Sequence, residues 1–407
     1  MNVAALAEPS SIPASGDVLS RRLLSVDVLR GLCVAGMILV TNAGDWNHVY
    51  WPLQHATWNG VTPTDMIFPT FLFLAGVSMT YSFAARRKRG EPAARIAAHV
   101  VRRSALLIFL GLFLNCFDLL QLTDLRIPGV LQRIGLCYLC AGLLYLAFAG
   151  QPPVRLAIAL IASMGVLVTL YWALQTLVPV PGYGAGRLEP VSTLSAFLDR
   201  AVFTTKHLWH WGGPGQVWDP EGLLSTLPAI ANVLLGILSG VWLRTTGTQG
   251  RKVLGMGAAG IALMLVALAL DPLIPINKKI WTPSFMFFSG GFSMVALAVL
   301  YGCLDLGAGL SGRGAQQPWR WAITPALVFG SNAIGGFALA TIVSALVGLL
   351  RLPTPAGQTA GPGGFVVQHL LPWMSPWNAS LAYAVLFVLL VLAMLWPLYQ
   401  RRIFLRL

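Results

Sequence analysis

The stretch NAGDWNHVYWPLQHATWNGVTPTDMIFP, residues 42–69, separates two strongly apolar runs and carries polar groups that the rest of the chain rarely contains. Within 24 positions it places eight polar side chains: Asn42, Asp45, Asn47, His48, Gln54, His55, Asn59 and Asp65. Amide and titratable groups gathered at one face of a membrane protein indicate binding or chemistry there. The stretch therefore predicts a functional site between the first two spans, with two histidines as candidates.

Composition places the chain among membrane proteins. Its 407 residues are 56% hydrophobic and 10% charged, with a mean hydropathy of +0.72, whereas a soluble domain is typically about 25% charged. We expect an all-α polytopic membrane protein, a bundle of about ten transmembrane helices of roughly 20 residues each. The apolar segments lie near 25–43, 64–85, 104–122, 128–149, 153–178, 222–243, 253–270, 281–304, 322–350 and 378–399.

The basic residues predict the orientation of these helices. The segments that would share a side with both termini carry 18 lysines and arginines, and the opposite segments carry 7. Because the richer side is usually cytoplasmic, we expect both termini in the cytoplasm. The net charge of +13 sits in short loops, where it favours contact with anionic membrane lipid over nucleic-acid binding. The outward-facing segments are then 42–63, 179–221, 271–280 and 351–377.

Several local patterns have ordinary explanations. Residues 1–20 are rich in Ala, Ser and Pro and predict a disordered cytoplasmic tail, with residues 21–407 as one transmembrane domain. All five cysteines lie in apolar runs, so we expect no disulfide. His207 and His210 could share a metal ion, but no carboxylate or cysteine cluster supports this, so we predict no metal. LSAFLDRAVF, at 194–203, predicts an interfacial helix, and an alternative is that 179–221 forms a lid over the outward site.

Charged residues inside spans need a partner or a function, because each costs about 2.5–3.5 kcal/mol at a helix centre. Asp27 and Arg30 are three apart, which favours a local ion pair, although Arg30 could instead bind a phosphate-bearing ligand. Arg133 should point inward, for pairing or for ligand binding, with Asn115 and Asp118 as candidate partners.

Other polar groups lie at the starts of helices or in turns. Asp65 opens the second helix, where the helix dipole favours a carboxylate. Asp219 and Glu221 open another helix, as caps or as acceptors for the hydroxyl and amino groups of a sugar. Asn277 and Lys278 interrupt an outward turn, and lysines there run against the usual charge bias, which favours a ligand role.

A set of motifs resembles the heparan-α-glucosaminide N-acetyltransferase family, within the transmembrane acyltransferases that include bacterial NagX-type proteins. The likeness covers nearly everything after residue 21, and HATWNG and IPGVLQR are its specific blocks. The matching pieces are SVDVLRGL at 25–32, MILVTNAG at 37–44, QHATWNGVTPTDMIFPTFLFLAG at 54–76, LRIPGVLQRIG at 125–135, DPEGLLSTLPAI at 219–230, PINKKIW at 275–281, PALVFGSN at 325–332 and YQRRIF at 399–404.

The resemblance implies a reaction that crosses the bilayer, from cytoplasmic acetyl-CoA to an amine on the far side. It implies His55 as the active-site histidine, Asn42 as the residue acting with it, and a homodimer. We expect the coenzyme at Arg30, Arg133 and Asn332. We expect the amino sugar at Asp45, Trp58, Asn59, Asp219, Glu221, Asn277 and Lys278. A bacterial inner membrane is the expected location.

The chemistry of these groups fits that expectation. His55 could accept the amine proton as a general base, or take the acetyl group itself. The amide of Asn42 could stabilise the oxyanion. An amino-sugar transporter is the main alternative, although no repeat between halves is visible and the polar cluster lies at one face. A second alternative is an O-acetyltransferase acting on a surface glycan.

Overall fold

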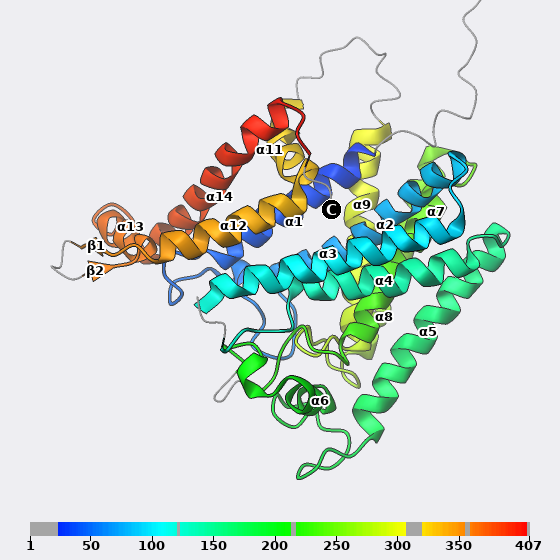
Figure 1. Ribbon diagram of the computed structural model, residues 1–407, viewed down its shortest axis with the longest axis horizontal. Helices are drawn as coiled ribbons and strands as arrows, with labels where there is room; N and C mark the ends of the chain where they lie inside the picture. The colour runs from blue at the N-terminus through cyan, green and yellow to red at the C-terminus, as the bar shows by residue number, and fades with distance from the viewer. Residues whose placement is uncertain (1–22, 120–122, 213–216, 307–319, 355–358, 405–407) are drawn as a thin grey trace, which may run out of the picture.

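The computed structural model describes residues 23–119, 123–212, 217–306, 320–354 and 359–404, so the expected tail at 1–20 lies outside the described residues. Most of the described chain is helical (Figure 1). The helices are α1 Leu24–Thr41, η1 Trp51–Leu53, η2 Pro63–Met66, α2 Ile67–Lys88, α3 Ala93–Leu119, α4 Val130–Phe148, α5 Pro153–Leu177, α6 Leu194–Phe203, η3 Thr205–His207, α7 Thr226–Leu243, α8 Gln249–Leu270, α9 Pro283–Leu300, η4 Tyr301–Leu306, α11 Arg320–Ser331, α12 Ala333–Gly348, α13 Pro362–Leu370 and α14 Pro376–Gln400. Two short strands, β1 Leu352–Pro353 and β2 Thr359–Ala360, pair antiparallel.

The helices confirm an all-α polytopic membrane protein. Within the described residues, nine helices are long and apolar enough to cross a bilayer, and the bent pair α11 and α12 brings the number to ten. The expected span 153–178 is helix Pro153–Leu177, and LSAFLDRAVF forms α6. Apolar length therefore located most of the spans, because a helix that crosses the hydrocarbon core must be both long and apolar.

One expected span is broken. We predicted a single helix over 322–350, but α11 and α12 meet at an angle of 81°. Asn332 lies at the break with φ −126° and ψ 42°, and its Nδ2 donates to the carbonyl of Ile403 at 3.1 Å. The prediction of one continuous helix was wrong because a tertiary hydrogen bond holds a non-helical residue there, which hydropathy cannot show.

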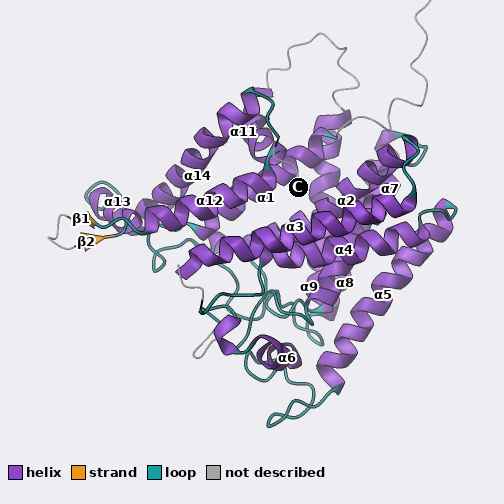
Figure 2. Cartoon of the chain, viewed as in Figure 1, coloured by secondary structure: helices purple, strands orange, loops and turns teal. Residues whose placement is uncertain are grey.

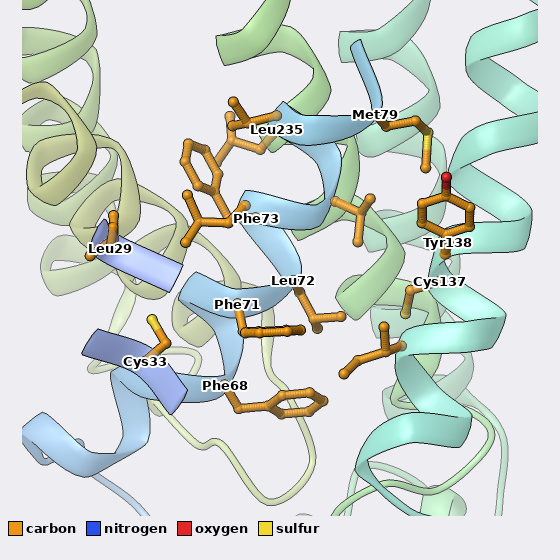
Figure 3. Packing of buried hydrophobic residues seen from close by; sticks show 14 of the residues in the cluster. Leu29, Cys33, Phe68, Phe71, Leu72, Phe73, Met79, Cys137, Tyr138 and Leu235 are labelled. Carbon is orange, nitrogen blue, oxygen red and sulfur yellow. The ribbon is translucent and has the colours of Figure 1, made fainter. Parts of the chain in front are cut away.

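Helices α2 and α7 form the centre of the bundle. Inside the protein, 78% of the α7 span is buried, compared with 17% of the α8 span. Figure 3 shows Phe68, Phe71, Leu72 and Phe73 of α2 packed among side chains of α1, α4 and α7. The spans with few buried residues therefore form the outer, lipid-facing layer.

Close backbone contact joins the two central helices. A Cβ on Gly76 of α2 would lie 2.1 Å from the carbonyl oxygen of Val233, and one on Gly236 of α7 would lie 2.0 Å from that of Phe73. No side chain fits at either position, so glycine sets the separation of α2 and α7, as small residues do at many membrane helix interfaces.

Several of the loops that join these helices gather at one end of the bundle, which we call the loop face (described residues 42–62, 123–129, 178–212, 217–225 and 271–282). Figure 2 shows them as a group of teal segments around α6. Gly60 N donates to Ile276 O at 2.7 Å, and Ile127 N donates to His207 O at 2.9 Å. The tertiary fold thus brings three distant parts of the sequence to the polar stretch that follows α1.

Candidate active site

His55 is held by a buried carboxylate. Its Nδ1 lies 2.7 Å from Oδ1 of Asp65, whose side chain is 1% exposed while that of His55 is 43% exposed. The other oxygen of Asp65 accepts from the backbone N–H groups of Ala56 and Thr62, both at 3.1 Å. Asp65 therefore ties both sides of the 55–62 turn together and fixes the imidazole ring.

Lys278 completes this group from the turn between α8 and α9. Its Nζ lies 3.0 Å from Nδ1 of His55 and 3.3 Å from Oδ1 of Asp65. Nδ1 carries either a proton or a lone pair, so it cannot bond both neighbours at once. We assign the proton to Nδ1, because Asp65 Oδ1 can then accept from both His55 and Lys278. This tautomer leaves the lone pair on Nε2 of a half-exposed ring.

The surroundings of His55 favour its neutral form. Partial burial and the adjacent ammonium of Lys278 lower the pKa of His55, and the hydrogen bond to Asp65 opposes this shift only in part. Burial likewise lowers the pKa of Lys278, against the attraction of Asp65 and Glu221. A neutral imidazole with a free Nε2 is the form that can accept a proton near pH 7.

The turn that carries Lys278 is fixed to the His55 loop by two asparagines. Asn277 is buried, its Nδ2 donates to Oδ1 of Asn59 at 3.0 Å, and its own Oδ1 accepts from Ile280 N at 3.1 Å. These bonds link the two turns directly. Both asparagines, which we expected to bind the acceptor, are thus engaged with each other.

A tryptophan cluster (Trp58, Trp209 and Trp218) covers the same region. Trp58 and Trp218 meet edge to face with centroids 5.3 Å apart, and Trp209 meets Trp218 at 5.1 Å. Lys279 places its Nζ 5.3 Å from the ring of Trp209 and 5.5 Å from that of Trp218. Trp58 also donates to Leu188 O at 2.8 Å. The 179–221 loop is therefore anchored beside His55 by aromatic and cation–π contacts.

A second charged group lies at the loop face. Arg126 forms a two-pronged hydrogen bond with Asp219, at 2.6 and 2.9 Å, and also pairs with Glu221. Burial disfavours ionised Glu221, but the charges of Arg126 and Arg133 hold its pKa below the ordinary value. The two carboxylates that we expected to bind a sugar are thus paired with an arginine.

Asn42 lines a separate pocket of about 650 Å³ between the ends of α1, α3, α4 and α12, which we call the Asn42 pocket. Arg126 and Trp209 contribute to its wall, and His55 is not among its lining residues. Asn42 Nδ2 donates to Ile38 O at 2.8 Å within its own helix. No described contact joins Asn42 to His55, although Trp209 belongs to both the pocket and the tryptophan cluster.

The three expected coenzyme residues do not form one site: Arg30 also donates to Gly330 O, near Asn332, at 3.4 Å, whereas Arg133 bonds other groups. Arg30 donates to Asp27 at 3.0 Å and to Ser78 at 2.7 Å, so the predicted local ion pair is present. Arg133 is buried near the loop face, where it bonds Gly222 O and Ser225 and lies over the ring of Trp281. Asn332 lies at the break between α11 and α12.

Two expected contacts are replaced or remain undescribed. Asn115, a candidate partner for Arg133, donates instead to Arg126 O at 2.7 Å and Pro128 O at 3.3 Å. The side chain of Asp118 lies outside the described part of the chain. Asp45 pairs with His48 and accepts from Asn47 N, away from the His55 group.

A metal site would need several ligating side chains close together. Among the described residues, no group of three or more His, Cys, Asp or Glu side chains is arranged to hold an ion. His207 Nδ1 is within 2.8 Å of Leu125 O, which binds its loop to the segment before α4.

Comparisons with known proteins now decide the family. The family model described as "Heparan-alpha-glucosaminide N-acetyltransferase, catalytic" matches residues 22–274, more than half of the chain. The chain belongs to the heparan-α-glucosaminide N-acetyltransferase family. It is 30% identical to the heparan-alpha-glucosaminide N-acetyltransferase of Homo sapiens, over 79% of this chain and 54% of that protein. It is 29% identical to that of Mus musculus, over 77% and 52%. The chain spans about half the length of the curated relatives it matches.

Sequence reasoning did not place Asp65 against His55 or Lys279 against the tryptophan cluster in this family member. Asp65 was interpreted only as a helix-start carboxylate, although its spacing of three from Thr62 marks a turn that could have been closed against His55. The role of Lys279 against the tryptophans had no local signal, because Trp209 and Trp218 are about 60 to 70 positions away.

Proposed function

We propose that this protein is a transmembrane acetyltransferase that moves the acetyl group of acetyl-CoA to the amine of a glucosamine-type sugar. The observation that carries the proposal is the His55–Asp65–Lys278 group at the loop face, in a chain of this family. A neutral imidazole, oriented through Nδ1 and free at Nε2, is the arrangement that general-base catalysis requires. The donor is supplied from the cytoplasm and the acceptor from the loop face, which we place outside the cell.

In the proposed step the amine nitrogen attacks the thioester carbonyl carbon. The new C–N bond forms, the C–S bond breaks, and the amine proton passes to Nε2 of His55 and then to the departing thiolate. Asp65 stabilises the imidazolium that forms, because its carboxylate accepts a hydrogen bond from Nδ1–H, with Nδ1 and Oδ1 2.7 Å apart. The same Nε2 could instead take the acetyl group first, as an acyl-imidazole.

Asn42 has a more specific role than a generic oxyanion donor in this geometry. Its NH₂ donates to Ile38 O at 2.8 Å and to Thr41 Oγ1 at 3.2 Å, so both N–H groups are engaged and its carbonyl oxygen remains to accept beside the Asn42 pocket. We propose that this oxygen accepts an N–H of the attacking amine and orients the nitrogen lone pair. Stabilising the oxyanion would require the NH₂ to release Ile38 O or Thr41 Oγ1 first.

The coenzyme remains assigned to arginines of the bundle. Arg30 is 12 residues from Asn42 on α1, about 18 Å at 1.5 Å per residue. A nucleotide near Arg30 would therefore need its pantetheine arm to run along α1 to bring the thioester near Asn42. Arg133 contributes a second charge, because its Nε and Nη1 have no hydrogen-bond partner among the described residues.

The test compares two histidines of the same loop. In proteoliposomes with labelled acetyl-CoA and glucosamine, His55→Ala should lower the rate of acetyl transfer by 1,000-fold or more, the loss typical of an essential general base and orienting group (roughly 10²–10⁴ from proton transfer alone). His48→Ala, which removes a histidine outside the group, should stay within about twofold. Full activity in His55→Ala would remove the residue from the mechanism. Coenzyme-independent uptake of amino sugar would favour the transporter.

A further inference from the structure

The Asn42 pocket has the chemistry of a carbohydrate site. Its walls carry indole rings of Trp209 and Trp211, which are flat apolar surfaces with an N–H at one edge. Trp211 is 73% exposed, so its ring is accessible to a ligand. The volume of about 650 Å³ lies in the range of ligand pockets that enclose molecules larger than one hexose.

Its amides present acceptors to the pocket. Asn42 and Asn115 both use their NH₂ groups on backbone carbonyls, at 2.8 Å to Ile38 O and 2.7 Å to Arg126 O. This fixes which atom is the oxygen, and no described residue donates to either oxygen. Ser344 of α12 adds a hydroxyl to the lining. Sugar hydroxyls both donate and accept, so they match this mixed set.

The charges at the pocket do not favour an anion. Arg126 is the one charged side chain among the lining residues of this described pocket. It is bonded by the carboxylates of Asp219 and Glu221, so the three groups together carry one net negative charge when ionised. An anionic ligand would therefore meet a neutralised arginine, and a uronate or sulfate group gains little here.

The Asn42 pocket and the His55 group are separate, but Trp209 and the Lys278–Lys279 turn connect their walls. Trp209 lines the pocket and contacts Lys279, and Lys279 follows Lys278, whose Nζ lies 3.0 Å from His55. We propose that the Asn42 pocket binds the non-reacting sugar units of an uncharged oligosaccharide whose terminal glucosamine amine reaches His55. This inference rests on the proposed acetyl transfer, and it makes Trp211, Ser344 and Asn115 specificity residues for an extended neutral acceptor.

The experiment uses three acceptors that share a terminal glucosamine. These are glucosamine itself, a trisaccharide whose other two units are N-acetylglucosamine, and a trisaccharide that contains a uronate. The full-length protein in proteoliposomes should show kcat/KM about tenfold higher for the neutral trisaccharide than for glucosamine, with no such gain for the uronate compound. Trp211→Ala and Ser344→Leu should each remove that tenfold advantage, the loss of one aromatic contact being worth about a factor of ten.

Trp373→Ala is the matched control, because Trp373 is 84% exposed and is not a lining residue of the Asn42 pocket. It should retain the tenfold preference. An unchanged trisaccharide preference in Trp211→Ala and Ser344→Leu would overturn the inference. A rise in KM for acetyl-CoA alone in these variants would also overturn it, because the pocket would then bind the donor. A preference of the wild type for the uronate compound would overturn it as well.

A binding experiment tests this inference independently of the proposed acetyl transfer. Equilibrium dialysis of the neutral trisaccharide against the wild type and Trp211→Ala needs no chemistry. Binding that weakens about tenfold in Trp211→Ala, together with no acetyl transfer by the wild type, would retain the pocket and reject the proposed reaction. Transfer without any difference in binding would retain the reaction and reject the pocket.

Discussion

The 42–66 segment holds two His–Asp pairs that have similar contact distances and different surroundings. His48 Nδ1 lies 2.6 Å from Asp45 Oδ2, three residues away, and the two side chains are 37% and 29% exposed. His55 Nδ1 lies 2.7 Å from Asp65 Oδ1, ten residues away, and the carboxylate is 1% exposed. Contact distance therefore does not distinguish them; burial of the carboxylate does.

The neighbours of each pair explain their different capacities. The ring of His48 packs edge-on against Trp377, and Asp45 N donates to Ser380 Oγ, so that pair attaches the loop to α14. Asp65 instead receives two backbone donors and the approach of Lys278, and it orients a ring that stays half exposed. An oriented, accessible and neutral base arises only where the carboxylate is fixed from several sides.

The largest difference between the pairs should appear when each carboxylate becomes an amide. Asp65→Asn places an NH₂ donor beside Nδ1, which favours the proton on Nε2 and disables the base. We expect kcat to fall by 100-fold or more, as loss of the correct tautomer does in other histidine–carboxylate pairs (up to about 10⁴). Initial rates of acetyl transfer measure it, with Asp45→Asn as the control, expected within twofold. Equal losses in both variants would mean that the pairs are equivalent.

An effect of intermediate size should appear in the pH dependence of kcat/KM, which reports the protonation of His55. Lys278→Met removes the positive charge that helps to lower the pKa of His55, so that pKa should rise. Because the base must be neutral, the acid limb of kcat/KM should move to higher pH, by up to about one unit (a tenfold rate loss on that limb). Lys206→Met, an exposed lysine of η3, is the control. A limb that stays in place or moves to lower pH would show that Lys278 does not set the protonation of His55.

The smallest effect concerns stability. Asp45→Ala removes a partly exposed ion pair, so the free energy of unfolding should fall by less than about 1 kcal/mol. Asp65→Ala leaves the N–H groups of Ala56 and Thr62 without their acceptor, which costs roughly 1–3 kcal/mol per buried group. Thermal midpoints in detergent compare the two variants. If Asp45→Ala lowered the thermal midpoint more than Asp65→Ala, Asp65 would not be the carboxylate that contributes more to stability.

Much of the architecture was predictable because spans are local features. Apolar length placed α1, α2, α4, α5, α7 and α8 within a few residues of their ends, and α6 at its observed range. The break at Asn332 was not predictable, since it depends on a hydrogen bond to Ile403, 71 positions away. The same limit applied to the site, where Asn59, Asn277, Asp219 and Glu221 turned out to be bonded to other protein groups.

By itself the sequence determined which segments lie in lipid, that the polar stretch after α1 is exposed at one end, and that His55 belongs to a specific motif. It could do so because hydropathy and short motifs act over a few helical turns. Only the tertiary structure decided that Lys278 lies beside His55, that Arg126 pairs with two carboxylates, and that the NH₂ of Asn42 is bonded within its own helix. Those outcomes depend on partners 93 to 223 positions apart, or on side-chain rotation, and packing alone selects among them.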